Sequence, residues 1–337
     1  MFLNVRIFKG YNMKKMTSLI LSLSVLLLFI TACSSDGLDS ESLPTEENSG
    51  EEQIKVVTSI FPMHEIVKEV AGDRADVSLM VGANEDAHHY EPSAQAVASV
   101  NEADVFVYSS HVMEFWAKTL LDVVENESIQ IVELADGLDL ELEDSHDHDY
   151  GHDEHEEHEG HDHGGLDPHF WLDLTAVNHQ LPLIVEALSQ ADPEGRAYYE
   201  ENAEKFSKTL LELDEQYESA LSEATERVFI VQHQAFGHLA HRYHLEQVSV
   251  GGLITEVEAS PKKLVEIIEF IKTQNVPIVY YQSGDNSGVA ETIAKETNTE
   301  IAVLHDLENK PMNLKNDGNL YLEAMRENLE QLKKSIK

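Results

Sequence analysis

The chain has 337 residues, enough for two ordinary domains, and its 42% hydrophobic and 26% charged residues are normal for a globular protein. Asp and Glu number 63 against 23 Lys and Arg, which gives a formal net charge of −40. This excess of acid excludes nucleic acid as an expected partner, because phosphate binding needs a basic face, and it favours the attraction of cations.

The N-terminus is predicted to be a lipoprotein signal peptide over residues 1–33. Two lysines precede an apolar run over 19–30, which is short for a permanent membrane span and typical of a secretory signal. The run ends in Ile-Thr-Ala-Cys, which resembles the sequence cut by the lipoprotein signal peptidase, so we expect lipid on Cys33. The alternative is an ordinary signal peptide with an incidental cysteine. Residues 1–12 have no clear role.

A polar segment follows the cysteine. Residues 34–53 are rich in Ser, Glu and Gly and contain almost no apolar side chains, which predicts a disordered tether. We therefore expect a protein anchored by lipid on the extracellular face of a bacterial cell membrane, with its folded part held away from the membrane by this tether.

From residue 54 the chain alternates between short apolar runs and helical segments. Strands are predicted over 54–60, 77–81, 105–108 and 130–133, and helices over 62–71, 93–101 and 114–126. Such alternation on short connections predicts a parallel sheet with helical cover. We assign residues 54–173 to an N-terminal α/β lobe.

The same alternation restarts near residue 226. Strands are predicted over 227–232, 277–281 and 301–304, and helical segments over 235–243, 261–274, 288–297 and from about 319 onward. Residues 226–337 are therefore assigned to a second, C-terminal α/β lobe.

A long helical stretch, about 193–224, separates the two lobes. Its apolar residues follow the three-and-four spacing of one buried stripe: Tyr199, Ala203, Phe206, Leu210, Leu213, Tyr217 and Leu221. The plain alternative is one more surface helix, but its length and position favour a rigid connector, which we assign to 174–225. The predicted fold is two parallel-sheet α/β lobes joined by a long rigid helix, with a metal site in the cleft between the lobes.

The first of two classes of histidine lies in a tract within the N-terminal lobe. Seven histidines fall between 146 and 163, interleaved with Asp and Glu: His146, His148, His152, His155, His158, His161 and His163. Such a tract binds divalent metals loosely and cannot by itself form a defined tetrahedral site. The alternative is a solvated acidic loop without a metal role.

The second class stands in ordered sequence. His88 follows the predicted strand 77–81, His233 ends the strand 227–232, and His169 lies between the two lobes. Ligands of open α/β sheets bind at the carboxyl ends of the strands. Three converging imidazoles would suit Zn²⁺, whereas manganese asks for more oxygen ligands. Taken singly, each histidine could equally be a capping or core residue.

The remaining histidines are interpreted without a metal role. We expect His89 to be a hydrogen-bonding neighbour of His88 rather than a ligand. Surface or capping positions are expected for the others: His64, His111, His179, His238, His241, His244 and His305.

Five motifs carry a resemblance to a known family. They are TSIFPM (58–63), HHYEPS (88–93), NEADVFVY (101–108), DPHFWL (167–172) and HQAFGHLA (233–240). In this order they resemble the zinc-specific solute-binding lipoproteins of ABC importers, a metal-binding family with a rigid linking helix. The similarity runs from about 54 to 310, nearly the whole mature chain.

The resemblance implies a site and a partner. It gives His88, His169 and His233 as metal ligands, with a histidine at the third position marking zinc over manganese. An acidic His-rich loop ahead of the second ligand is typical of the zinc branch. The implied cargo is Zn²⁺ and the implied partner is the permease of an ABC importer in the membrane.

The fourth ligand is left open. Members of the family often carry Glu or Asp after the strand predicted here at 277–281, but this chain reads Gln-Ser-Gly-Asp over 282–285. Gln282 is a poor zinc ligand because its carboxamide is neutral. Water or Asp285 are the other candidates for the fourth position.

Together these features predict an extracellular high-affinity zinc-binding component of an ABC-type uptake system, monomeric and not an enzyme. A zinc-dependent hydrolase at the cell surface would use the same three ligands plus water. The sequence, however, shows no His-Glu-x-x-His and no Gly-x-Ser-x-Gly. A third class, a surface adhesin lipoprotein, would not need the three histidines.

Overall fold

The computed structural model describes residues 53–83, 85–142, 166–253, 260–283, 286–312, 314 and 318–337. The predicted signal peptide with Cys33, the tether as far as residue 52, the His-rich tract 146–163 and Asp285 lie outside the described residues. What the sequence indicates for these segments therefore stays a prediction. Among the described helices, none is both long enough and apolar enough to cross a membrane.

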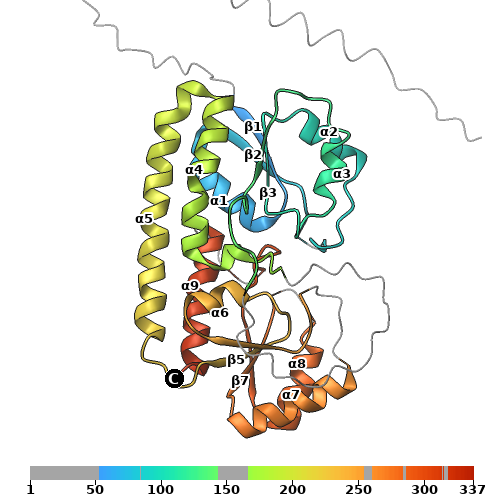
Figure 1. Ribbon diagram of the computed structural model, residues 1–337, viewed down its shortest axis with the longest axis vertical. Coiled ribbons are helices and arrows are strands. Elements are labelled where there is room, and N and C mark those ends of the chain that lie inside the picture. The colour runs from blue at the N-terminus through green and yellow to red at the C-terminus, as the bar shows by residue number, and fades with distance from the viewer. Residues whose placement is uncertain are drawn as a thin grey trace, which may run out of the picture. The chain divides into compact units, whose positions relative to one another are not determined.

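The N-terminal lobe, in the upper part of Figure 1, is built on a four-stranded parallel sheet, and its strand order is β2-β1-β3-β4. Its strands are β1 (Ile54–Thr58), β2 (Ala75–Leu79), β3 (Val105–Tyr108) and β4 (Gln130–Glu133). Its helices are α1 (Phe61–Ala71), α2 (Ala94–Asn101) and α3 (Ala117–Leu121). The residues of β3 are all buried, as a central parallel strand requires.

The C-terminal lobe repeats this plan with the parallel strand order β6-β5-β7-β8. Its strands are β5 (Val228–Val231), β6 (Glu246–Ser249), β7 (Ile278–Tyr281) and β8 (Glu300–Val303). Its helices are α6 (Gly237–Arg242), α7 (Pro261–Gln274) and α8 (Gly288–Thr297). In each lobe the first strand along the chain lies inside the sheet, between the second and the third. The strand order reverses at this point, and ligands of such sheets bind there, beyond the carboxyl ends of the strands.

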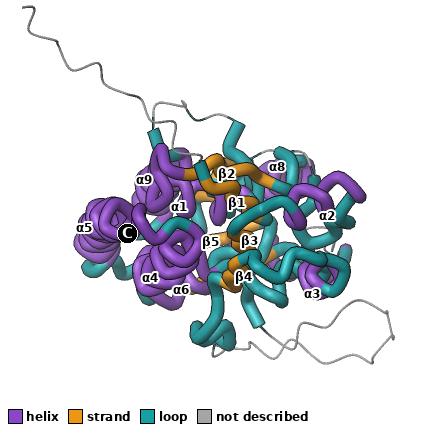
Figure 2. Tube along the Cα trace, turned by 90° about the horizontal axis from the view of Figure 1, so that it is seen from above, coloured by secondary structure: helices purple, strands orange, loops and turns teal. Residues whose placement is uncertain are grey.

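Three long helices join the lobes: α4 (Leu174–Ala191), α5 (Arg196–Leu221) and α9 (Leu320–Ser335). Figure 2 shows them gathered on one side of the sheets, and α5, with 26 residues, runs beside both lobes in Figure 1. All seven residues of the predicted stripe are buried on α5. The predicted fold class is confirmed. The connector, however, consists of the antiparallel pair α4 and α5 together with α9, where one long helix was predicted.

Polar contacts fix these helices to each lobe. Asp192, between α4 and α5, accepts a bidentate pair from Arg74 of the N-terminal lobe at 2.7 and 3.1 Å. Asp214 of α5 accepts from Arg242 of the C-terminal lobe at 2.7 Å. At the start of α9, the Leu320 amide donates to the carboxylate of Glu65 on α1 at 2.8 Å. The connector is thus tied to both lobes, as a rigid link requires.

Besides the separate helix α4, two further elements differ from the sequence prediction, and β2 lies two residues earlier than predicted. The helix predicted over 114–126 is reduced to α3, because Glu114 turns inward and accepts from the backbone N–H groups of Ser109 and Ser110. Strand β6 was not predicted, because it is a half-buried edge strand with the polar sequence Glu-Gln-Val-Ser and no apolar run.

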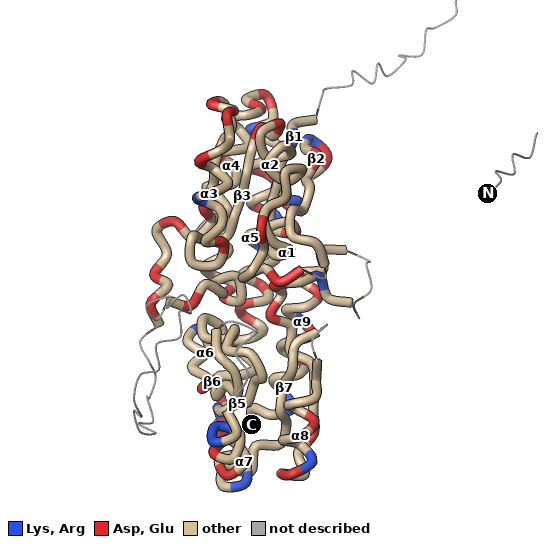
Figure 3. Tube along the Cα trace, turned by 90° about the vertical axis from the view of Figure 1, so that its right-hand side faces the viewer, with Lys and Arg blue, Asp and Glu red and all other residues tan. Residues whose placement is uncertain are grey.

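Charge is divided unequally between the lobes. In the sequence, residues 54–173 hold 29 Asp and Glu against four Lys and Arg, whereas residues 226–337 hold 16 against twelve. Figure 3 shows basic residues gathered on and near α7 and α8 of the C-terminal lobe. The potential that attracts cations therefore belongs mainly to the N-terminal lobe.

Candidate metal centre

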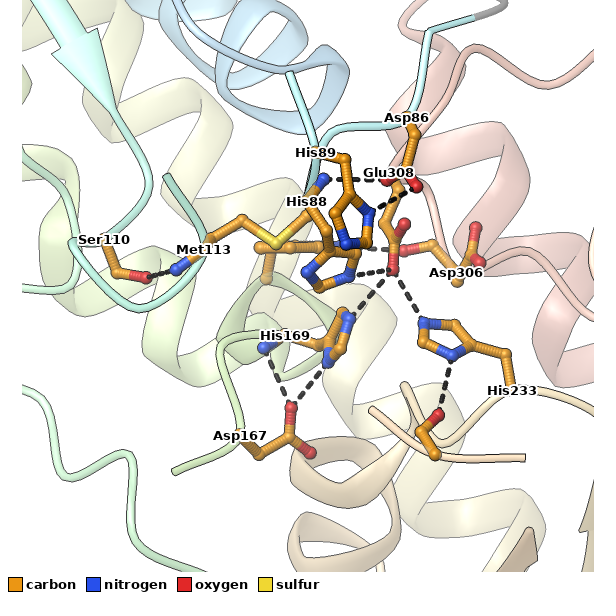
Figure 4. Close-up of polar contacts among 12 residues, drawn as sticks. Asp86, His88, His89, Ser110, Met113, Asp167, His169, His233, Asp306 and Glu308 are labelled. Atoms are coloured by element: carbon orange, nitrogen blue, oxygen red, sulfur yellow. Dashed lines mark hydrogen bonds and ion pairs between the residues drawn. The ribbon is translucent and has the colours of Figure 1, made fainter. Parts of the chain in front are cut away.

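Four buried side chains converge at one point between the lobes. Oε1 of Glu308 lies 3.3 Å from Nε2 of His88, 2.9 Å from Nε2 of His169 and 2.8 Å from Nε2 of His233 (Figure 4). One donor atom from each of the four lies within 4.8 Å of the others. The side chains are only 0–4% exposed. The structure therefore brings together the three histidines that the sequence singled out.

The four residues come from different parts of the fold. His88 lies on the loop after β2, and His233 lies two residues after the end of β5. Glu308 lies on the loop after β8. His169 precedes a short 3₁₀ turn, Phe170–Leu172, at the start of the connector. His88 and His169 thus come from residues 54–173, His169 at the end of that segment where the connector begins, and His233 and Glu308 come from the C-terminal lobe.

Glu308 was missed by the sequence analysis, which left the fourth position to water, Asp285 or Gln282. Gln282 is buried, and its side-chain oxygen has no hydrogen-bond partner among the described residues, whereas Asp285 lies outside them. The signal that could have found Glu308 is the rule already applied to the other strands, since it follows the last strand of the second sheet.

The loop that carries Glu308 is held on three sides. The amide of Leu304 donates to the carbonyl of Tyr281 at 3.0 Å. The buried side chain of Asn328 on α9 accepts from the His305 amide and donates to its carbonyl, both at 2.7 Å. The indole of Trp171 donates to the carbonyl of Asp306 at 2.8 Å. These contacts fix the position of the carboxylate.

Two of the imidazoles are oriented through their second ring nitrogen. His169 donates from Nδ1 to Oδ1 of Asp167 at 2.6 Å, and His233 donates from Nδ1 to the carbonyl of Gly252 at 3.0 Å. Such partners fix the tautomer that leaves Nε2 with a lone pair for a metal. For His88 the structure gives Nδ1 no hydrogen-bond partner among the residues that it describes.

Asp167 is itself fixed by the C-terminal lobe. His238 donates from Nε2 to the carbonyl of Asp167 at 2.8 Å. Gly237 makes room for the Asp167 side chain, since a Cβ there would lie 2.3 Å from its Oδ2. A surface or capping role was expected for His238; instead it is buried and holds the residue that orients a candidate ligand.

The other histidines were expected to be surface or capping residues, or, for His89, a hydrogen-bonding neighbour. His111, His179, His241 and His244 are exposed, as predicted, and His89 pairs with Asp86 as a hydrogen-bonding neighbour. His64 is half-buried, and His305 is buried, so the surface interpretation was wrong for His305. Its burial follows from the packing of its loop beneath α9, which the sequence does not reveal.

The electrostatics of the cluster favour a central cation. Burial lowers the pKa of His169, but the charge and hydrogen bond of Asp167 and the contact with Glu308 outweigh it and raise this pKa to about 10. Burial raises the pKa of Glu308, but the charges of His233 and His88 outweigh it and hold this pKa well below its usual value. An anionic carboxylate among imidazoles is thus stabilised by positive charge.

Three imidazole nitrogens and one carboxylate oxygen form a compact donor set of the kind that Zn²⁺ prefers in tetrahedral sites. The fold and the site together define a two-lobed α/β binding protein, with a rigid helical link and a buried cluster of four potential metal ligands between its lobes.

Comparison with known proteins agrees with this class. The family model described as "Zinc-uptake complex component A periplasmic" (ZnuA) matches residues 56–335, and the chain belongs to this family. The zinc-binding lipoprotein AdcA of Streptococcus pneumoniae is 34% identical over 327 residues, covering 96% of this chain and 61% of the relative. The chain thus spans about three fifths of that relative. The high-affinity zinc uptake system protein ZnuA of Bacillus subtilis is 32% identical over 309 residues, covering 92% of this chain and 94% of the relative.

Solved structures show the same fold. The Zn(II)-bound ZnuA-like domain of Streptococcus pneumoniae AdcA has a TM-score of 0.70 at 32% identity, covering 84% of this chain and 98% of that one. The laminin-binding protein Lmb of Streptococcus agalactiae, described as bifunctional with adhesin and metal-transporting activity, has a TM-score of 0.72 at 32% identity. That match covers 84% of this chain and all of the Lmb chain.

Proposed function

We propose that this protein is the zinc-capturing component of an ABC-type zinc uptake system. It binds one Zn²⁺ through Nε2 of His88, His169 and His233 and a carboxylate oxygen of Glu308, and it delivers the ion to a membrane permease. The observation that carries the proposal is the buried convergence of these four donors between two rigidly linked lobes. Membership of a zinc-uptake family supports it.

The donor set favours a carrier of zinc over a zinc hydrolase. A catalytic zinc site keeps three protein ligands and an open position for water. Here Glu308 occupies the place of that fourth group, and the four side chains are almost fully buried. The family is likewise one of zinc uptake and not of enzymes.

Adhesion is a second candidate because of the likeness to Lmb, whose description names both adhesin and metal-transporting activity. An adhesin does not require a buried cluster of metal donors, so the cluster favours uptake as the function of this site.

The setting of the protein is part of the proposal. It acts as a monomer on the extracellular face of a bacterial membrane, anchored through lipid on Cys33, and two relatives named as zinc-binding lipoproteins support this placement. The wild type should fractionate with membranes and Cys33→Ala should be soluble, because two acyl chains anchor stably. A wholly soluble wild type would remove the anchor from the proposal.

The proposed ligands are tested by calorimetric zinc titration after dialysis against a mild chelator. The full chain should retain one tight zinc equivalent and show no hydrolytic turnover. Single replacements His88→Ala, His169→Ala, His233→Ala and Glu308→Gln should weaken that equivalent. His111→Ala is the matched control, because His111 is 73% exposed and stands outside the cluster. Full affinity in any of the four variants would exclude that residue as a ligand.

A further inference from the structure

The buried position of the zinc site raises the question of how the ion reaches it. The four donors are 0–4% exposed, so a hydrated ion cannot meet all of them at once from solvent. The ion must exchange its water for protein ligands one at a time, beginning at an exposed donor. The structure contains two observations that indicate where this exchange begins.

The first observation is that the three imidazoles are held unequally. Partners on Nδ1 fix His169 and His233, whereas Nδ1 of His88 has none among the described residues. Nε2 of His88 is also farthest from Glu308, at 3.3 Å against 2.9 and 2.8 Å. Its ring centroid lies 5.8 and 6.2 Å from the other two rings, which are 5.2 Å apart. The ring of His88 is therefore the one best able to turn.

The second observation is an exposed imidazole directly beside His88. His89 is 43% exposed, and its Nδ1 lies 2.9 Å from Oδ2 of Asp86. The other carboxylate oxygen of Asp86 accepts from the backbone N–H of His88 at 2.8 Å. One carboxylate thus holds both the exposed imidazole and the backbone of the buried donor (Figure 4).

The pairing suits His89 for metal binding. With Nδ1 donating to Asp86, the lone pair of His89 is on Nε2, where it can bind a metal. The same arrangement orients His169 through Asp167 inside the site. His89 and Asp86 also belong to the strongly acidic N-terminal lobe, which concentrates cations near its surface.

We propose that His89, oriented by Asp86, is the outer ligand through which Zn²⁺ passes to and from the buried site. In uptake, Nε2 of His89 replaces one water of the hydrated ion. His88 then turns to bind the same ion, and the bond to His89 breaks as the three inner donors complete the shell. Any proton on a binding imidazole is released to solvent. This inference rests on the proposed zinc-binding function.

An outer ligand has a distinctive kinetic signature. Because it binds the ion on the path and not in the final complex, it lowers the barriers for association and dissociation by the same amount. Its loss should slow both steps equally and leave the equilibrium dissociation constant unchanged. A ligand of the final complex would instead change that constant.

The test is stopped-flow measurement of zinc association, with dissociation into an excess of chelator. It compares the wild type with His89→Gln and with the matched control His111→Gln. His111 is likewise an exposed imidazole of the N-terminal lobe whose Nδ1 pairs with a carboxylate, that of Glu133, at 2.7 Å. Each is measured in the full chain and after deletion of 146–163, so that the tract's histidines cannot substitute for His89.

In the deletion background, both rate constants of His89→Gln should fall by about tenfold, which corresponds to a barrier raised by about 1.4 kcal/mol in each direction. The equilibrium constant and the control should not change. Unchanged rates in His89→Gln, or an equal fall in His111→Gln, would overturn the inference. So would a weakened tight equivalent in His89→Gln, because His89 would then belong to the bound state. A wild type without a tight equivalent would instead refute the proposed function.

Discussion

The two lobes share one strand order but contribute to the zinc site in different ways. The N-terminal lobe supplies His88, on a loop where its ring has no partner on Nδ1 among the described residues. The C-terminal lobe supplies His233, held by Gly252, and Glu308, on a loop clamped by Asn328 and Trp171. Firmly held donors are thus found in the C-terminal lobe, whereas acidic charge is concentrated on the N-terminal lobe.

This difference suggests a division of labour within the proposed function. Diffuse negative charge collects a cation without fixing its geometry, whereas donors held by buried hydrogen bonds select one coordination geometry. The N-terminal lobe would then attract and admit the ion, and the C-terminal lobe with His169 would hold it. Four changes can break or sharpen this comparison.

The largest effect is expected from removing a firmly held ligand. His169→Ala and Glu308→Gln should each weaken zinc affinity by more than about 100-fold, above the range typical for residues that only orient a ligand. His88→Ala should weaken zinc affinity less than these two changes, because the ring of His88 is held less firmly. Competition titration against a chelator of known affinity measures the zinc affinity of each variant and so ranks the three losses. A larger loss for His88→Ala would contradict the comparison.

The interior of the N-terminal lobe should carry a pH dependence of stability. Burial raises the pKa of Glu114 to about 7. Because this pKa is higher in the folded than in the unfolded chain, the contribution of Glu114 is present at low pH and is lost as pH rises through 7. The loss is roughly 2–4 kcal/mol.

Glu114→Gln should remove this dependence. Denaturant unfolding of the metal-free protein between pH 5 and 8 should show the variant gaining on the wild type as pH rises. All other ionisable groups are the same in both proteins, so their contributions cancel in the difference. A gap that does not change with pH would show that Glu114 does not titrate in this range.

Loss of the carboxylate that orients His169 should have a smaller effect on zinc. Asp167→Asn should weaken affinity by about 10- to 100-fold, as is usual for such partners of metal-bound histidines. Gly237→Ala should act in the same direction, because its Cβ would displace the Asp167 side chain. The exposed Asp122→Asn is the control. Calorimetry that finds wild-type affinity in Asp167→Asn would remove Asp167 from this role.

The smallest effect on the tight site is expected from deleting the His-rich tract. We propose that 146–163 is a low-affinity collector, because a tract without apolar residues must lose conformational entropy to bind metal. Deletion should abolish the weak zinc equivalents, leave the tight one nearly unchanged, and impair growth only when zinc is scarce. The weak binding should also fade below about pH 6.5, where free imidazoles gain a proton. Loss of the tight equivalent would mean that the tract supplies ligands.

The sequence by itself determined the plan of two α/β lobes and three of the four clustered residues. The strands and helices could be predicted because hydrophobic periodicity is local: the α5 stripe and the buried strand β3 follow directly from residue spacing. His88 and His233 could be located because they follow strand ends, and the family motifs identified all three histidines.

Tertiary structure alone decided what completes and orients the site. The position of Glu308 after a strand marks it only as a candidate, and its contacts with His88 across 220 residues of chain and with His169 across 139 are recorded by no local pattern. The same holds for His238 and Gly237, which fix Asp167 from the other lobe. Edge strand β6 and the shortened α3 also depend on burial and on the inward turn of Glu114. Periodicity specifies which faces are buried, but only the folded chain determines which distant side chains meet there.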